Sequence, residues 1–324
     1  MKHLPSATVV VCTRNRPSHL LACLASLKCQ TYAHFDILVV ENGKAIGVHA
    51  ICERSGVGYL HEPEPGVSRA RNTGTRAARG EIVAFIDDDA IAEADWLESL
   101  LAAFTDPAVG SAAGTIRYMK AYGDSRSMSS EEVPDTADCT SLTSFDHQTR
   151  RWFTAACFGG IGDGSNMAFR KALFGRAVRF DERLGRGRLL DGGEDHIIFV
   201  SVINAGYRVV RVPKAVVRHP FPADPEFRLA RQYRDLQTTI AYMIFLLIEF
   251  PKFRVEIAGF LFRAVLKRVA GIARGRDGRM PRSLALKAIV RGPLLYWRAL
   301  QNWRTKTAPV PAQPATKPRF SRSL

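Results

Sequence analysis

Apolar and polar positions along the first 220 residues form blocks that predict strands and helices in alternation. Short runs rich in Val, Ile and Phe, bounded by polar turns, are typical of buried strands. Leucines recur at helical spacing after the start signals Pro17 and Ser18. The predicted strands cover residues 8–12, 35–40, 57–60, 81–86, 165–170 and 209–217, and further helices cover residues 67–78, 93–104 and 194–204.

This alternation predicts an α/β fold with a mostly parallel sheet and helices on both faces. Ligands of such sheets bind outside the carboxyl ends of the strands. Arg14, Glu41 and the triplet Asp87-Asp88-Asp89 all follow predicted strands. We therefore expect the functional groups to converge at this edge of the sheet. Residues 114–162 lack periodicity, which indicates a long functional or mobile loop.

The Asp triplet is the most informative motif of the chain, because it ends the apolar run 81–86. Three carboxylates at the end of a buried strand are costly unless a cation compensates for them. A hard divalent ion that shares its coordination shell with a diphosphate would supply that compensation. The alternative is an acidic turn that caps the helix predicted to begin near Glu93.

The net charge of +15 is concentrated at the C-terminal end. Residues 250–324 hold 17 Lys and Arg against two acidic residues, whereas the remaining 249 residues hold 29 of each sign. This asymmetry predicts a neutral catalytic or binding domain with a cationic appendage. We place the domain over residues 1–222, the basic helical appendage over 223–304, and a disordered tail rich in Pro, Ser and Thr over 305–324. It argues against a uniformly basic nucleic-acid-binding protein.

The C-terminal helical segments favour contact with a membrane surface. The apolar stretch 238–250 is shorter than the roughly 20 residues that span a bilayer. Later segments mix apolar residues with Lys and Arg, and Tyr296, Trp297 and Trp303 are candidate interfacial anchors. We expect an anionic membrane surface as the partner. A homo-oligomer interface and RNA binding are the alternatives, and we expect no nucleic-acid partner. Arg231 and Arg234 are candidates for a donor or acceptor phosphate, or form a solvated basic face.

Six cysteines without ligand-like or paired spacing indicate reduced thiols of a cytosolic protein. The apolar run 7–12 is too short for a signal peptide. Together with the basic helices, these features predict a cytoplasmic protein that is peripheral at the inner face of the plasma membrane.

Six separated stretches, in this order, resemble family 2 glycosyltransferases of the GT-A fold, a Rossmann-like nucleotide-diphospho-sugar transferase fold. They are VVVCTRNR, FDILVVENG, PGVSRARNTGTRAARGEIVAFIDDD, GGIGDGSNMAFRK, RFDERLG and GGEDHIIFVSVINAGYRVV. The resemblance covers residues 8–220, about two thirds of the chain.

The resemblance implies a metal site. The DxD motif of the family falls on the Asp triplet, so Asp89 would ligate Mn²⁺ or Mg²⁺ that bridges the donor diphosphate, and Asp87 or Asp88 would contact the ribose. Neutralising a departing nucleoside diphosphate is what such a transfer needs. His219 is similar to the histidine that completes the metal shell in many GT-A enzymes, and imidazole suits Mn²⁺ better than Mg²⁺. The alternative for His219 is a solvated histidine at a strand end.

The resemblance also implies a nucleotide pocket. Its lining would come from the loop after the first strand and from the end of the second: Thr13, Arg14, Asn15, Arg16 and Glu41. The family often has Asp in place of Glu41, and either carboxylate accepts a hydrogen bond from a pyrimidine N–H, which favours a UDP-sugar weakly. Arg71-Asn72 resembles the ARN element of the family, where an Arg near a helix N-terminus neighbours the diphosphate. The alternative is that Arg69 and Arg71 are solvated helix residues.

Glu194-Asp195 is the candidate for the catalytic carboxylates. Direct displacement with inversion needs one carboxylate near the acceptor hydroxyl. The pattern of the family favours Asp195 as the general base and Glu194 as an orienting neighbour or acceptor contact. The alternative is that both residues favour the dipole of the helix that they begin.

These features together predict a metal-dependent, inverting glycosyltransferase. It would move a sugar from a nucleoside-diphosphate sugar to a hydroxyl of a glycan or a lipid-linked glycan. A catalytically inactive sugar-nucleotide-binding scaffold is the alternative, and the presence of Asp89 and Asp195 favours the enzyme. A nucleotidyltransferase would normally need a glycine-rich phosphate loop, which residues 13–16 lack.

Overall fold

The computed structural model describes residues 4–121, 128–132, 142–175, 178–221, 225–273 and 281–307. A mixed sheet lies at its centre, in the order β3-β2-β1-β4-β9-β6-β10-β5, with β7 paired to β6 and β8 to β10. The strands are β1 (Ala7–Thr13), β2 (Phe35–Asn42), β3 (Gly58–Glu62), β4 (Ile82–Asp87), β5 (Ile91–Ala92), β6 (Val109–Ala121), β7 (Met128–Glu132), β8 (Thr143–Phe145), β9 (Asn166–Arg170) and β10 (Arg208–Phe221).

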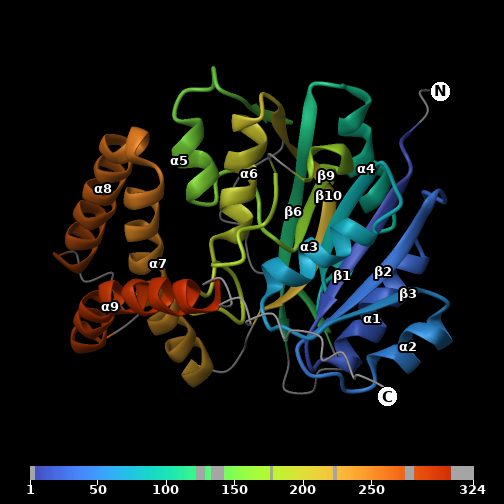
Figure 1. Cartoon of the computed structure of the whole chain (residues 1–324), viewed down its shortest axis with the longest axis horizontal. Coiled ribbons are helices and arrows are strands. Elements are labelled where there is room, and N and C mark those ends of the chain that lie inside the picture. Colours follow the sequence, from blue (N-terminus) through green and yellow to red (C-terminus); the bar gives the residue numbers. More distant parts are fainter. Residues whose placement is uncertain are drawn as a thin grey trace, which may run out of the picture.

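Helices cover both faces of this sheet, as the sequence predicts (Figure 1). One face packs against α1 (Pro17–Lys28), α2 (Val48–Ser55) and α4 (Trp96–Ala102). The other packs against α3 (Val67–Ala77), α5 (Trp152–Cys157) and α6 (Glu194–Asn204). The β-branched and aromatic residues of β1 and β4 alternate between these two cores, because successive side chains of a strand point to opposite faces.

The parallel register of the first strands brings their carboxyl ends together. Cys12 of β1 lies beside Asp87 of β4, and Thr13 lies beside Glu41 of β2. Strand β9 is antiparallel to both of its neighbours, β4 and β6. Asn166 at the start of β9 accepts a hydrogen bond from Trp96 Nε1 at 2.8 Å and donates to two backbone carbonyls. These hydrogen bonds fix the position of the start of β9 within the sheet.

Part of the segment predicted to be a loop, residues 114–162, is regular structure. Strand β6 continues to Ala121, and helix α5 follows further on. Gly114 sits where the Ala215 carbonyl and the Asn166 side chain approach its backbone, so the break in the apolar pattern reflects close packing at that point. Residues 122–127 and 133–141 of this segment lie outside the described residues.

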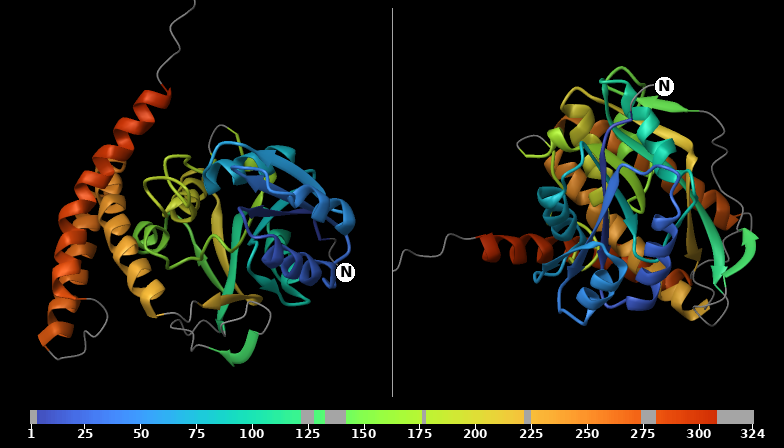
Figure 2. Two further views of the ribbon diagram at one scale, coloured as in Figure 1. Left: turned by 90° about the horizontal axis from the view of Figure 1, so that it is seen from below. Right: turned by 90° about the vertical axis from the view of Figure 1, so that its right-hand side faces the viewer.

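Three C-terminal helices lie on the side of the molecule opposite β2 and β3 (Figures 1 and 2): α7 (Pro225–Glu249), α8 (Arg254–Ala273) and α9 (Arg282–Thr307). Apolar side chains of α7, among them Tyr242 and Phe245, belong to the same core as α5 and α6. Helix α7 is therefore packed onto the sheet unit, and the domain boundary near residue 222 stays a prediction. Of the predicted tail, residues 308–324 lie outside the described residues, and 305–307 belong to α9.

Helix α9 packs along α7. Gly292 makes this close approach, since a Cβ there would lie 2.5 Å from Ile240 Cγ2. Tyr296, a predicted interfacial anchor, is instead buried, whereas Trp297 is exposed. A search of the described helices for one long and apolar enough to cross a bilayer finds none.

Candidate active site

The loop after β1 and the end of β4 meet at the carboxyl edge of the sheet. Thr13 Oγ1 donates a hydrogen bond to Asp88 Oδ2 at 2.6 Å. The guanidinium of Arg16 lies 2.6 Å from Asp89 Oδ2 and 3.4 Å from Asp88 Oδ1. Burial raises the pKa of Asp88 to about 6, although Thr13 and Arg16 oppose the shift. The buried carboxyl group of Asp88 thus holds the loop after β1 in place through Thr13 and Arg16.

Asp87, Asp89 and His219 form a cluster of metal-ligand type, because one ligand atom from each lies within 4.8 Å of the others. His219 Nε2 is 3.1 Å from Asp89 Oδ1 and 3.9 Å from Asp87 Oδ2. Burial disfavours the imidazolium, but hydrogen bonds and charge from the two carboxylates outweigh it and raise the pKa of His219 to about 10. For Asp89, burial is likewise outweighed, by His219 and Arg16, and the pKa falls to about 2.

The donor set of this cluster fits a divalent cation. Carboxylate oxygens suit both Mn²⁺ and Mg²⁺, and the imidazole favours Mn²⁺ over Mg²⁺. Asp87 and Asp89 raise the pKa of His219, so the field of these two carboxylates favours positive charge beside them. Asp87 therefore joins the predicted pair Asp89 and His219 in the cluster.

Arg71 connects this cluster to the start of α6. Its guanidinium is buried, lies 2.9 Å from Glu194 Oε1, and donates to the Gly164 carbonyl at 3.0 Å. It also lies 3.6 Å from Asp87 Oδ1. Arg71 is held by the wall of the site, so the alternative of a solvated helix residue does not describe it.

The pKa values of Glu194 and Asp195 are shifted in opposite directions. For Asp195, burial favours the neutral acid, but His196 and Arg71, together with backbone N–H donors, outweigh it and lower the pKa. Asp195 Oδ2 accepts a hydrogen bond from the Gly164 N–H at 3.0 Å. Burial and the charge of Asp195 raise the pKa of Glu194 to about 7, despite the ion pair with Arg71. Asp195 therefore loses its proton at a lower pH than Glu194 does.

A cavity of about 410 Å³ joins the metal-type cluster to these carboxylates. Asp87 and His219 line one part of it, and Glu194 and Asp195 line another. Helix α7 supplies a further wall, with the side chains of Arg231, Asp235, Thr238, Thr239 and Tyr242. The cavity can therefore hold a substrate between a cation site and an ionised carboxylate.

Asp163 and Tyr242 are among the lining residues that the sequence did not predict. Asp163 lies in the cavity, and burial together with the charges of Asp195 and Asp87 raises its pKa. Tyr242 packs against Gly193, where a Cβ would lie 2.5 Å from the ring. The run GDGSN before β9 was a signal for Asp163, whereas Tyr242 lies in an apolar helix stretch without any local signal.

Other predicted nucleotide residues lie outside the lining of this cavity. Both carboxylate oxygens of Glu41 already accept hydrogen bonds at 2.7 Å, from the Ile46 N–H and the Tyr59 hydroxyl. Asn72 bonds the backbone of Phe180 through both its amide nitrogen and oxygen. Arg14 and Asn15 are exposed in the loop after β1, next to the cluster in sequence. Their roles toward a nucleotide stay predictions.

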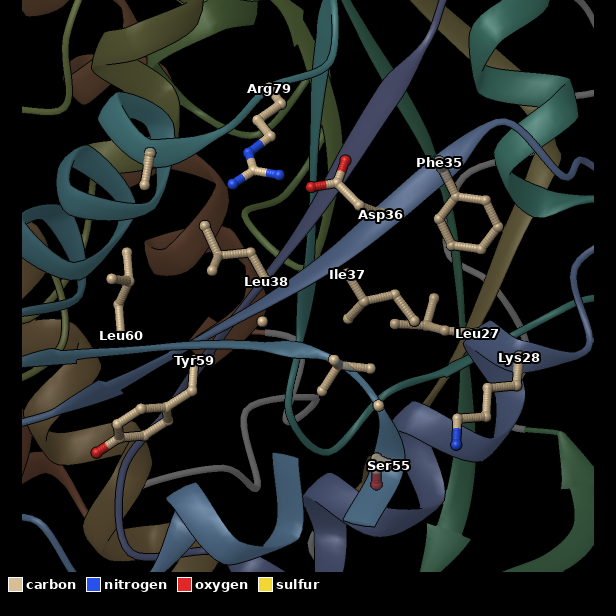
Figure 3. Close-up of a pocket in the computed structure, with 14 residues that line it drawn as sticks. Leu27, Lys28, Phe35, Asp36, Ile37, Leu38, Ser55, Tyr59, Leu60 and Arg79 are labelled. Atoms are coloured by element: carbon tan, nitrogen blue, oxygen red, sulfur yellow. The ribbon is translucent and has the colours of Figure 1, made fainter. Parts of the chain in front are cut away.

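A larger cavity of about 650 Å³ lies at the opposite ends of β2 and β3 (Figure 3). Its labelled lining mixes apolar side chains, from Leu27, Phe35, Ile37, Leu38 and Leu60, with polar ones, among them Lys28, Asp36 and Arg79. Asp36 already accepts a hydrogen bond from Thr8 Oγ1 at 2.8 Å. Because size alone does not make a reactive site, we place the function in the smaller cavity, where the titratable groups converge.

Comparison with known proteins places the chain among sugar transferases. Residues 8–176 match the family model described as glycosyl transferase family 2. An N-acetylglucosaminyltransferase of Sinorhizobium fredii is 27% identical over 244 residues, which is 72% of this chain and 57% of that protein. A glucosyl-dolichyl phosphate glucuronosyltransferase of Haloferax volcanii is 25% identical over 231 residues, 65% of this chain and 68% of that protein. The chain thus spans a little over half the length of the first relative.

Solved structures share the fold. A mannosyltransferase from Pyrobaculum calidifontis, in complex with GDP-Man and Mn²⁺, superposes with a TM-score of 0.58 at 20% identity, covering 94% of this chain and 84% of that one. GalNAc-T7 with UDP, GalNAc and Mn²⁺ gives 0.54 at 16% identity, covering 68% and 45%. These likenesses confirm the GT-A fold predicted from the sequence.

Proposed function

The chain belongs to glycosyl transferase family 2, and on that premise we propose that it is a metal-dependent, inverting glycosyltransferase. It takes a sugar from a nucleoside-diphosphate sugar and transfers it to a hydroxyl of a glycan or lipid-linked glycan. The observation that carries the proposal is the single cavity lined by Asp87 and His219 of the metal-type cluster and by ionised Asp195.

Asp195 suits the role of general base. Its lowered pKa keeps it ionised at neutral pH, and it lines the cavity opposite the metal-type cluster. It takes the proton of the acceptor hydroxyl while the oxygen bonds to the anomeric carbon. The bond from that carbon to the diphosphate oxygen breaks in the same step, so one displacement inverts the anomeric centre. We keep Glu194 as the neighbour that holds Arg71.

The leaving diphosphate needs positive charge. Asp87, Asp89 and His219 would hold Mn²⁺ or Mg²⁺, with the nitrogen ligand favouring Mn²⁺. Such an ion neutralises charge that develops on the departing diphosphate. Arg71 is positioned to add to this field, because its guanidinium lies beside Asp87 at the boundary of the cavity.

The nucleotide itself would lie over the loop of Thr13 to Arg16. Asp88 fixes this loop through Thr13 and Arg16. We retain Asp87 or Asp88 as the predicted ribose contact, with Asp87 also within reach of the cation. Since both oxygens of Glu41 already accept protein hydrogen bonds, a base contact there would need one of its remaining lone pairs. UDP stays the weakly favoured nucleotide.

Calorimetric titration of the purified protein with UDP, GDP and dTDP, each with and without Mn²⁺, tests this proposal. We expect metal-dependent binding of one nucleotide, abolished by Asp89→Ala. Asp95→Ala is the matched control, because Asp95 is an exposed carboxylate near the start of α4. If folded wild-type protein bound none of the three nucleotides with Mn²⁺, the proposed donor class would be wrong. Binding that Asp89→Ala leaves intact would contradict the proposed metal site.

A further inference from the structure

The outer face of helix α9 carries a row of large apolar side chains. Leu286, Val290, Leu294 and Trp297 are 64%, 62%, 55% and 56% exposed. Spacings of four, four and three residues place them along one side of the helix. The opposite side, which includes Ala288, Gly292 and Tyr296, is buried. Soluble monomers rarely expose a continuous apolar row of this kind without a partner.

Basic side chains run beside this row. Lys287, Arg291 and Arg298 are exposed, and their spacings of four and seven residues place them along a neighbouring side of α9. No Asp or Glu occurs anywhere between residues 282 and 307. The outer surface of α9 therefore combines an apolar row with a flank of one charge sign.

A hollow of about 320 Å³ lies where the apolar row meets the basic flank. It is lined by Gln237 of α7 and by Arg291, Leu294, Leu295 and Arg298 of α9. Arg291 and Arg298 are seven residues apart, so they lie roughly 10 Å from each other along the helix. Two guanidinium groups at the edge of a small hollow with aliphatic walls match the chemistry of a phosphate headgroup and the start of its acyl chains.

We propose that this face of α9, with the hollow beside α7, is a docking surface for a bilayer that contains anionic phospholipids. The apolar row would enter the boundary between headgroups and acyl chains, and the basic flank would meet the lipid phosphates. A second copy of this chain fits less well, because a symmetric contact would bring two flanks of equal charge together. Nucleic acid would leave the aliphatic row without a partner.

The position of α7 gives this docking surface a consequence for the active site. Arg231, Asp235 and Thr238 of α7 line the catalytic cavity, whereas Gln237 lines the hollow and Ile240 contacts Gly292 of α9. One helix thus separates the two surfaces, and a helix with its side chains is about 10 Å thick. If the proposed function holds, docking would bring the cavity close to a lipid-linked acceptor.

Co-sedimentation of the full chain with vesicles tests the docking surface. One vesicle preparation contains phosphatidylcholine alone, and the other contains phosphatidylcholine with phosphatidylglycerol. We expect the protein to bind the anionic vesicles at least about tenfold more tightly than the neutral ones, given the usual contribution of several basic residues. The triple variant Leu286→Gln, Val290→Gln and Leu294→Gln should lose at least about tenfold in binding.

Two further variants complete the design. Arg291→Gln with Arg298→Gln should lose binding to the anionic vesicles by roughly tenfold and change binding to neutral vesicles little. Leu21→Gln with Leu142→Gln removes exposed leucines far from α9 in sequence and should bind as the wild type does. Circular dichroism spectra check that each variant is folded, and glutamine is chosen because it favours helices.

Three results would overturn the proposal. The first is that the wild type does not bind anionic vesicles, and the second is that the triple variant binds them as tightly as the wild type. The third is that light scattering shows a dimer for the wild type and a monomer for the triple variant, while neither protein binds vesicles. The assay contains no nucleotide or sugar donor, so its failure would leave the transferase proposal intact. Failure of the nucleotide titration would likewise leave the docking surface untouched.

Discussion

Replacement of Asp195 by Asn separates a general base from a residue that only begins a helix. Removing a general base typically lowers turnover by about 100- to 10,000-fold. At about 1.4 kcal/mol for each tenfold, this raises the activation barrier by about 3–5 kcal/mol. We expect Asp195→Asn to fall in this range while donor affinity stays near that of the wild type.

The structural cost of the same change is small. Asp195 Oδ2 accepts from the Gly164 N–H, and Oδ1 accepts from the His196 N–H at 2.9 Å. An Asn side chain has one acceptor oxygen, so it keeps one of these hydrogen bonds and loses the other. The free energy of unfolding should fall by about 1 kcal/mol. Loss of turnover should therefore exceed anything that loss of stability explains.

The assay follows release of the nucleoside diphosphate from the donor whose base the nucleotide titration identifies, with water or an added glycan as the acceptor. Glu194→Gln is the comparison, because Gln can still accept a hydrogen bond from Arg71 through its amide oxygen. Its turnover should fall less than that of Asp195→Asn. If Asp195→Asn kept turnover within about tenfold of the wild type, the assignment of Asp195 as base would be wrong.

Three further predictions concern charge in the site. His219→Ala should weaken Mn²⁺ binding by at least about 10- to 100-fold in calorimetry, since it removes one member of the ligand cluster, and unchanged affinity would contradict that role. Arg71→Met should lower the free energy of unfolding in urea by about 3–5 kcal/mol by leaving a buried carboxylate unpaired, whereas half-exposed Arg69→Met should cost about 1 kcal/mol or less. Without metal, the part of the stability that Asp88 contributes should fall by roughly 2 kcal/mol as pH rises from 4 to 6, because its raised pKa lets the native state hold the proton more tightly. Asp88→Asn should remove this part of the slope and leave the part that comes from the raised pKa of Glu194.

The sequence predicts the strands and helices well where one period dominates. The first four parallel strands and helix α6 appear at the expected places, because burial on both faces leaves apolar runs that polar turns interrupt. The prediction of a loop from Gly114 onward was wrong for the residues that belong to β6 and α5. There, close approach of Asn166 and Ala215 required a glycine inside β6, and a partner about 50 or 100 residues away leaves no local pattern.

The division of roles within the Asp triplet was left open by the sequence, because only Asp87 belongs to β4 and the next two residues form the turn after it. Strand alternation therefore does not decide where the side chains of Asp88 and Asp89 point. In the structure Asp87 and Asp89 face His219, and Asp88 faces Thr13. Helical spacing is more informative, since adjacent residues such as Arg71 and Asn72 point about 100° apart.

What the sequence could not show depends on distant packing. Asp163 was not predicted, and its pKa is raised by burial and by the charges of Asp195 and Asp87, which come from two other elements. Arg71 was predicted from its motif, but its burial against Glu194 and Gly164 was not, because Arg76 of the same helix is exposed. The residue type alone does not tell whether a helical Arg is solvated or buried.

Packing also changes how the C-terminal helices relate to the chemistry. Gly193 has a φ of 88°, in the left-handed region that favours glycine, and Tyr242 of α7 packs directly against it. The next two residues are Glu194 and Asp195, so the backbone that positions both carboxylates rests on α7. Since α9 packs along the other side of α7 through Gly292, a contact made on the outer face of α9 lies one helix away from the proposed base. Helix α7 is thus part of the wall of the active site, and the basic side chains of α9 lie one helix further out, where they are free to meet an anionic surface.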